Sequence, residues 1–216
     1  MSRRTSVQPS ETAADRAYAV IRERILDGTL AGGALVSEGE FAADLQLSRT
    51  PVREAFLRLQ AEGWMTLYPK RGALVRPVSP DEDREVLEAR LLVETAAVHT
   101  ASAASDDAAA LAEDLTGILE RQRDALNTRD AEAFARADVD FHQRVAASGN
   151  NGILTAFYGT LQDRQRRMTA TTVHRYDGAP HLLLEQHEAL TRAIADRDPD
   201  AFAALLRRHV RENRAT

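Results

Sequence analysis

The sequence predicts a mainly α-helical protein in which an N-terminal winged helix-turn-helix is followed by an antiparallel bundle of about six helices. Two observations support this fold class. A short segment of helices ends in a basic hairpin, and helical apolar spacing then continues through the last two thirds of the chain, interrupted by short turns. The chain has 216 residues, of which 44% are hydrophobic, so it can form one large or two small domains with apolar cores.

The first helix is predicted over residues 13–27, because Tyr18, Ile21 and Ile25 recur at helical spacing and Gly28 follows as a stop signal. Leu35 and Val36 can form a short strand.

The next two helices are predicted to form the helix-turn-helix. Ser37 and Glu40 have the spacing of a capping box, which begins a short helix. Gln46 and Leu47 then form the turn into a helix over residues 48–62, which Gly63 closes. Either Ser48 or Thr50 can cap this second helix.

Two short strands follow, from Trp64 to Tyr68 and from Ala73 to Arg76, around a hairpin tip that carries Lys70, Arg71 and Gly72. Each of these pieces taken alone would more often be an ordinary surface feature. Their order within about 65 residues favours a winged helix.

The helix over 48–62 opens with Arg49, Thr50 and Arg53 beside an apolar stripe. Polar side chains at the exposed N-terminus of such a helix can reach base edges and phosphates in the major groove. The segment therefore predicts DNA binding, with the basic hairpin as a second contact.

The charge distribution agrees with a local DNA contact. The formal net charge is −5, but residues 1–76 hold 11 basic against 9 acidic side chains, and residues 77–216 hold 17 against 24. An acidic second part limits non-specific DNA binding. There is no cysteine, which excludes disulfides and thiolate metal sites, and neither a leader nor an 18-residue apolar run is visible, so we expect a cytoplasmic protein without a membrane span.

These residues resemble the GntR family of bacterial transcription regulators over about residues 13–76. The similarity lies in Leu47-Ser48-Arg49-Thr50-Pro51-Val52-Arg53-Glu54-Ala55, Leu59, Glu62-Gly63, and Pro69, Arg71, Gly72 and Val75. It implies that Arg49, Thr50 and Arg53 contact operator DNA and that Arg71 and Gly72 reach it from the wing. Two positions depart from the family pattern. Gly39 stands where many relatives have a DNA-contacting arginine, and Gln46 replaces a common turn glycine.

Pro77 and Pro80 mark a linker over residues 77–80, after which the sequence is helical to its end. Helices are predicted near 81–103, 107–127, 130–148, 151–173, 180–196 and 199–213. We therefore divide the chain into a flexible arm (1–12), a winged helix domain (13–76), the linker, and an all-helical effector domain (81–213).

Four polar residues of the predicted bundle occupy positions where the pattern calls for apolar ones. Asp138 and His142 lie four residues apart on one helical face, and His187 and His209 lie on the apolar stripes of two consecutive helices. Both histidines are eleven residues from Asp198 in the turn between their helices, so they should stand at the same height. Three neutral imidazoles and one carboxylate can hold a divalent metal ion; histidines satisfied within the core are the alternative.

The second part also resembles the FCD effector domain of FadR-like GntR regulators, over about residues 80–212. Metal-binding members carry an Asp-x-x-x-His motif and two later histidines, which correspond here to Asp138, His142, His187 and His209. Nitrogen and oxygen ligands suit zinc, nickel, manganese or iron, and zinc or nickel is the expected ion. Arg90 and Glu94 match the start of such domains, so Arg90 either pairs with an effector carboxylate or forms a surface ion pair.

The resulting hypothesis is a homodimeric, ligand-responsive regulator that binds a two-fold symmetric operator and is released by a small carboxylate held at the metal. Repression is the expected mode, since relatives are mostly repressors. Two alternatives are the same regulator with a metal-free ligand and dimerisation domain, and a small metalloenzyme.

Overall fold

The computed structural model describes residues 11–175 and 178–212, and the chain divides into two compact units. The main division falls between Pro77 and Val78, with Leu26–Gly28 grouped with the second unit. We call the first the winged unit and the second the helical unit. Most of the arm predicted over residues 1–12, and residue 213 at the predicted end of the effector domain, lie outside the described residues.

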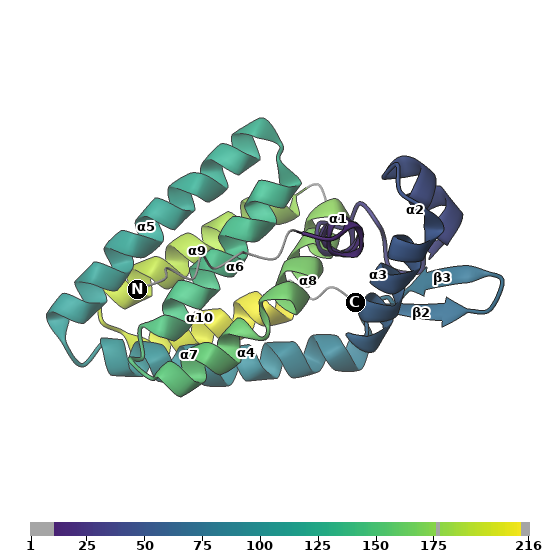
Figure 1. Ribbon diagram of the computed structural model, residues 1–216. Coiled ribbons are helices and arrows are strands. Elements are labelled where there is room, and N and C mark those ends of the chain that lie inside the picture. Colours follow the sequence, from purple (N-terminus) through teal and green to yellow (C-terminus); the bar gives the residue numbers. More distant parts are fainter. Residues whose placement is uncertain (1–10, 176–177, 213–216) are drawn as a thin grey trace, which may run out of the picture. The chain divides into compact units, whose positions relative to one another are not determined.

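Over its described residues, from 11 onward, the winged unit contains three helices and a small sheet (Figure 1). In chain order its elements are α1 (Ala13–Leu26), β1 (Leu35–Val36), α2 (Glu38–Asp44), α3 (Arg49–Ala61), β2 (Met65–Tyr68) and β3 (Gly72–Val75). The strands are antiparallel in the order β1-β3-β2, and Leu74 pairs with Leu35 on one side and Thr66 on the other. The predicted winged helix-turn-helix is confirmed.

Local sequence signals explain how α2 and α3 begin. The amide of Glu40 donates to the Ser37 hydroxyl over 3.1 Å and the Ser37 amide donates to the Glu40 carboxylate over 2.9 Å, so the predicted capping box is present. Ser48 is the N-cap residue of α3, but its side chain makes no capping hydrogen bond. Gln46 has a φ of 55°, a left-handed conformation that a glycine adopts with less strain.

The helical unit contains seven helices in the described residues. They are α4 (Pro80–Ala101), α5 (Ser105–Thr128), α6 (Ala131–Ala147), α7 (Gly152–Gly159), α8 (Gln162–Arg175), α9 (Ala179–Ala195) and α10 (Pro199–Glu212). The prediction of a single helix over 151–173 is therefore wrong. The helix ends at Gly159, a residue of low helix propensity, and the amide of Leu161 donates to the Tyr158 carbonyl in a tight turn.

The linker is also shorter than predicted. Pro80 is the first residue of α4, where it needs no hydrogen-bond donor, and the Ser79 hydroxyl accepts from the amide of Glu82.

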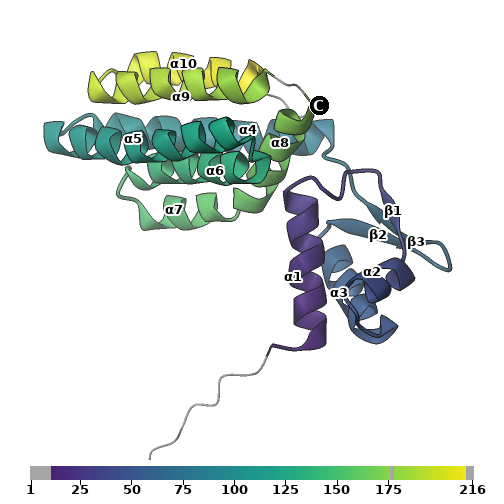
Figure 2. The same ribbon diagram turned by 90° about the horizontal axis from the view of Figure 1, so that it is seen from above.

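Helix α6 occupies the centre of the helical unit and packs against α4, α5, α7 and α8. The α9–α10 hairpin covers one side, with α9 on α5 and α10 on α4, whereas α7 lies on the other side of α6 (Figure 2). The core is apolar and includes Leu115, Phe141, Ile194, Phe202 and Leu206. Among the described residues, no helix combines the length and the apolar character that a membrane span requires.

Candidate metal centre and DNA-binding surface

Three histidines from three helices meet in the interior of the helical unit. His142 lies on α6, His187 on α9 and His209 on α10, and all three side chains are buried. Each offers a ring nitrogen within 4.8 Å of those of the other two. The ring centres of His187 and His209 are 4.9 Å apart, as the equal distance of both residues from the α9–α10 turn predicts.

Each histidine is held through its Nδ1 atom. This nitrogen lies 2.7 Å from a carboxylate oxygen of Glu94 for His142, 2.9 Å from Oε1 of Gln122 for His187, and 2.9 Å from Oε1 of Gln186 for His209. An oxygen acceptor at Nδ1 requires the Nδ1–H tautomer, which leaves the lone pair on Nε2.

The remaining ring nitrogens fit a metal ion. The Nε2 atoms of His142 and His187 are buried and have no hydrogen-bond partner among the described residues. Burial lowers the pKa of all three histidines below the usual value, and that of His187 to about 4. The imidazoles are therefore neutral near pH 7, which is the state that binds a metal ion.

Asp138 lies beside this group on α6, one turn before His142. One of its carboxylate oxygens is 3.5 Å from Nε2 of His187 and 4.0 Å from Nε2 of His142. The other accepts a 2.8 Å hydrogen bond from the hydroxyl of Thr169 and a longer one, 3.5 Å, from Gln165. The structure thus brings all four predicted metal ligands to one place, with Asp138 at the edge of the histidine cluster.

Arg90 and Glu94 are buried, so the interpretation as a surface ion pair is wrong. Nε of Arg90 donates to Oε1 of Glu94 over 3.1 Å, and the Tyr158 hydroxyl donates to the same oxygen over 2.5 Å. Burial raises the pKa of Glu94, while Arg90 and the tyrosine hydroxyl favour its charged form. Glu94 therefore joins α4, α6 and α7 at the back of His142.

A cavity of about 20 Å³ adjoins the cluster. Arg90, Asp138, Thr169, Thr172 and His209 supply its polar wall, and apolar side chains complete it. Nη2 of Arg90 is buried without a hydrogen-bond partner in the described part of the chain. A buried guanidinium nitrogen of this kind favours an anionic partner, but this volume holds about one water molecule.

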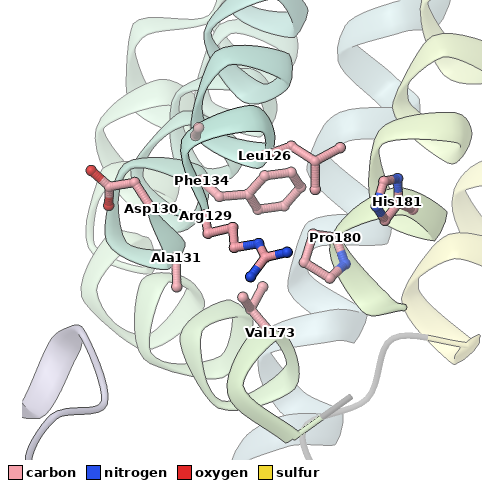
Figure 3. Close-up of a pocket in the computed structure, with 9 residues that line it drawn as sticks. Leu126, Arg129, Asp130, Ala131, Phe134, Val173, Pro180 and His181 are labelled. Carbon is pink, nitrogen blue, oxygen red and sulfur yellow. The ribbon is translucent and has the colours of Figure 1, made fainter. Parts of the chain in front are cut away.

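A larger pocket, of about 530 Å³, lies at the turn between α5 and α6 (Figure 3). The guanidinium of Arg129 extends toward Pro180 and Val173, and Phe134 forms part of the wall. Its charged residues, Arg129 and Asp130, are exposed, so water already solvates them. Arg90, whose Nη2 is buried without a hydrogen-bond partner among the described residues, lines the smaller cavity, which we take as the better candidate site.

The other histidines, His99, His174 and His181, are exposed and lie outside this cluster. The sequence reasoning did not identify Gln122, Gln186, Tyr158 and Thr169. Gln122 interrupts the apolar stripe of α5 between Leu119 and Leu126, which is the same kind of signal that singled out the histidines. Nothing in the local sequence marks the other three.

In the winged unit, α3 and the β2–β3 hairpin line one groove of about 720 Å³. Arg49, Arg53, Lys70 and Gly72 all border it, so the two predicted contact segments face a common surface. Thr50 and Arg71 are exposed but are not among the residues that line the groove.

Two glycines shape this surface. A Cβ atom at Gly39 would lie 3.5 Å from Nη2 of Arg49, so the arginine occupies space beside the missing side chain. Gly72 has a φ of 96°, and a Cβ there would be 2.2 Å from the Val36 carbonyl oxygen. The sheet itself therefore requires glycine at position 72.

Comparison with known proteins identifies both units. Residues 13–75 match the family described as "Bacterial regulatory proteins, gntR family", and residues 85–212 match the FCD domain. The chain belongs to the GntR family. A gluconate operon transcriptional repressor of Bacillus licheniformis is 30% identical to it, over 83% of this chain and 74% of that protein. The HTH-type transcriptional repressor RspR of Escherichia coli K12 is 27% identical, over 98% of this chain and 92% of that protein.

Solved structures show the same fold. A GntR transcriptional regulator from Rhodococcus sp. RHA1 is 25% identical, covers 92% of this chain and 94% of its own, and has a TM-score of 0.71. Escherichia coli McbR/YncC is 21% identical, covers 94% of this chain and 95% of its own, and has a TM-score of 0.68. This GntR protein is a DNA-binding transcription regulator with an FCD domain, and not an enzyme.

Proposed function

We propose that this regulator is a metal-dependent repressor that binds a two-fold symmetric operator as a homodimer and leaves it when a small carboxylate binds in the helical unit. The observation that carries the proposal is the convergence of three buried histidines whose Nδ1 atoms all face oxygen acceptors.

His142, His187 and His209 would hold the ion through Nε2, and Asp138 is positioned to supply a carboxylate oxygen. Zinc or nickel is the proposed ion, because nitrogen-rich sites with one carboxylate suit both. A bound divalent ion supplies positive charge to which a carboxylate can bind. A metal-free FCD domain, the alternative, would leave two buried Nε2 atoms unsatisfied.

Arg90 is the proposed effector-binding residue. Arg90 lines the small cavity beside the cluster, and its Nη2, which has no hydrogen-bond partner among the described residues, can donate to a carboxylate there. Because about 20 Å³ cannot contain a metabolite, binding must enlarge the cavity, and the proposal is that it does so by displacing α4.

Helix α4 is the proposed route from effector to DNA. It carries Arg90 and begins at Pro80, three residues after the winged unit ends at Pro77, so a displacement of α4 passes along a very short connection. An effector that binds only the displaced form shifts the population toward it, and the affinity for DNA changes accordingly. Arg49, Thr50, Arg53, Lys70, Arg71 and Gly72 are the proposed DNA contacts.

Metal analysis of protein purified without a histidine tag tests the metal site. We expect close to one equivalent of zinc or nickel, loss in the His187→Ala variant, and retention in the His99→Ala control, which removes an exposed histidine. If native protein holds under about a tenth of an equivalent and none rebinds after chelation, the metal-free alternative is correct.

Release from DNA tests the effector. The duplex is selected by the protein from a randomised pool, and binding is followed by fluorescence anisotropy while citrate or gluconate is added. Gluconate is included because one relative is named as the repressor of a gluconate operon. We expect release by one of these acids from the metal-loaded protein and none from the Arg90→Met variant; release of both proteins alike would remove Arg90 from the effector site.

A further inference from the structure

Helix α7 combines apolar composition with exposure. Ile153 is 83% exposed, Phe157 47% and Leu154 36%, whereas Tyr158 is the only buried residue of the helix. Ile153 and Phe157 are four residues apart and therefore lie on the same face. Contiguous exposed apolar residues of this kind mark an interaction surface.

The sequence around α7 lacks charge. No Asp, Glu, Lys or Arg occurs from residue 145 to residue 162, in a chain of which 28% is charged. The rest of the helical part is strongly acidic, since residues 77–216 hold 24 acidic against 17 basic side chains. Two copies of this part repel one another wherever acidic faces meet.

We infer that the α7 face, defined by Ile153, Leu154 and Phe157, is the surface on which a second copy of this chain docks. A two-fold interface brings a patch against the same patch of its partner, so the patch must be complementary to itself. An uncharged apolar patch meets this requirement, whereas a patch with one sign of charge does not. The inference rests on the proposed homodimer and names the face that forms it.

The surroundings of α7 leave this face accessible. The helix packs on α6 and α4, and Figure 2 shows it at the outer side of the helical unit, away from α9 and α10. Tyr158 packs with Val93 of α4 and so holds α7 against that helix through its buried side. The opposite side, with Ile153, Leu154 and Phe157, is left exposed for a partner.

Sedimentation of the full chain tests the inference. We expect wild-type dimers, and dissociation constants at least about 30-fold higher for the Ile153→Glu and Phe157→Glu variants, because each places two carboxylates in one apolar interface. The matched control is Leu182→Glu on α9, which adds the same charge at an apolar residue that is 39% exposed. Circular dichroism verifies that all variants are folded.

Placement is tested by cysteine cross-linking, since the natural chain has no cysteine to interfere. Oxidation should yield covalent dimers of the Ile153→Cys or Phe157→Cys variants and not of Leu182→Cys. A monomeric wild type, or glutamate variants that stay dimeric, would overturn the inference. A failure of the proposed function gives a different result. Dimers that cross-link at α7 but bind neither metal nor DNA would contradict the proposed function and leave the α7 interface intact.

Discussion

Nδ1 of His142 lies 2.7 Å from Oε2 of Glu94, and the other oxygen of the same carboxylate accepts from both Arg90 and Tyr158. One buried side chain thus orients a candidate metal ligand and neutralises a candidate effector-binding cation. A carboxylate behind a metal-binding histidine fixes the tautomer and raises the basicity of the ring.

The Glu94→Gln variant should therefore bind zinc about 10- to 100-fold more weakly than the wild type. Competition with a chromogenic chelator measures the affinity, and Glu88→Gln on the exposed side of α4 is the matched control. If the first variant fails to fold, Tyr158→Phe removes one hydrogen bond to the same carboxylate and should weaken binding in the same direction. Unchanged affinity in a folded Glu94 variant would exclude its orienting role.

Chelation of the metal should lower the melting temperature. An ion that binds only the folded state stabilises it by about 2.7 kcal/mol at a free concentration of 100 times Kd, which is about 5 to 10 °C for a chain of this size. Calorimetry before and after treatment with a chelator, and again after zinc is restored, measures the change. The His187→Ala protein should melt at the same temperature in all three conditions; a zinc-dependent shift in that variant would place the ion elsewhere.

The metal-free protein should lose stability as the pH falls from about 6.5 toward 4. The pKa of His187 is lowered to about 4 in the folded state, whereas an unfolded histidine has a pKa of about 6.5. Between these values the unfolded state binds the proton and the folded state does not, so stability rises with pH. Through His187 alone, the free energy of unfolding should be about 2 kcal/mol lower at pH 5 than at pH 8. Urea denaturation in a chelator measures it, and a His187→Gln variant with an equally steep pH dependence would refute the assignment.

Removal of an arginine from the α3 end of the groove should weaken operator binding. We expect each of Arg49→Ala and Arg53→Ala to cost about 1–3 kcal/mol and to relax sequence preference, because base contacts carry specificity. Anisotropy titration with the selected duplex measures the change. Arg16→Ala on α1 is the control, since this exposed arginine does not border the groove. Wild-type affinity of both groove variants would remove the DNA-reading role of α3.

Replacement of Gly39 by arginine should strengthen DNA binding and make it more dependent on salt concentration. Gly39 offers no side chain beside Arg49. An arginine at position 39 would therefore add a second cation that can contact a DNA phosphate. The slope of log K against log salt should steepen by about 1 in Gly39→Arg relative to wild type. Gly39→Ala separates the effect of charge from that of bulk. An unaltered slope would mean that position 39 does not face the DNA backbone.

Much of the candidate site follows from helical geometry and could be predicted from the sequence. Asp138 and His142 share one face because they are one turn apart, and His187 and His209 face one another because they are equidistant from a turn. The acceptors behind the rings could not be predicted in this way. Glu94 is 48 residues from His142 and Gln122 is 65 residues from His187, so only the packing of helices determines these pairs.

The fold shows the same division between local and long-range information. Capping at Ser37 and Glu40 is local and was predicted, whereas the break between α7 and α8 was not. The apolar spacing continues through Gly159, and this glycine ends the helix where Tyr158 turns inward to Glu94. The exposure of α7, in turn, depends on which helices cover it, and periodicity contains no such information.

The symmetric placement of His187 and His209 about the α9–α10 turn fixes the number of residues between them. One inserted residue in that turn would rotate α10 by about 100° relative to its present register and advance it by about 1.5 Å. His209 would then face away from His142 even if the hairpin still folded. The histidine cluster in the interior therefore fixes the number of residues in the turn over 196–198, although the turn itself lies at the surface.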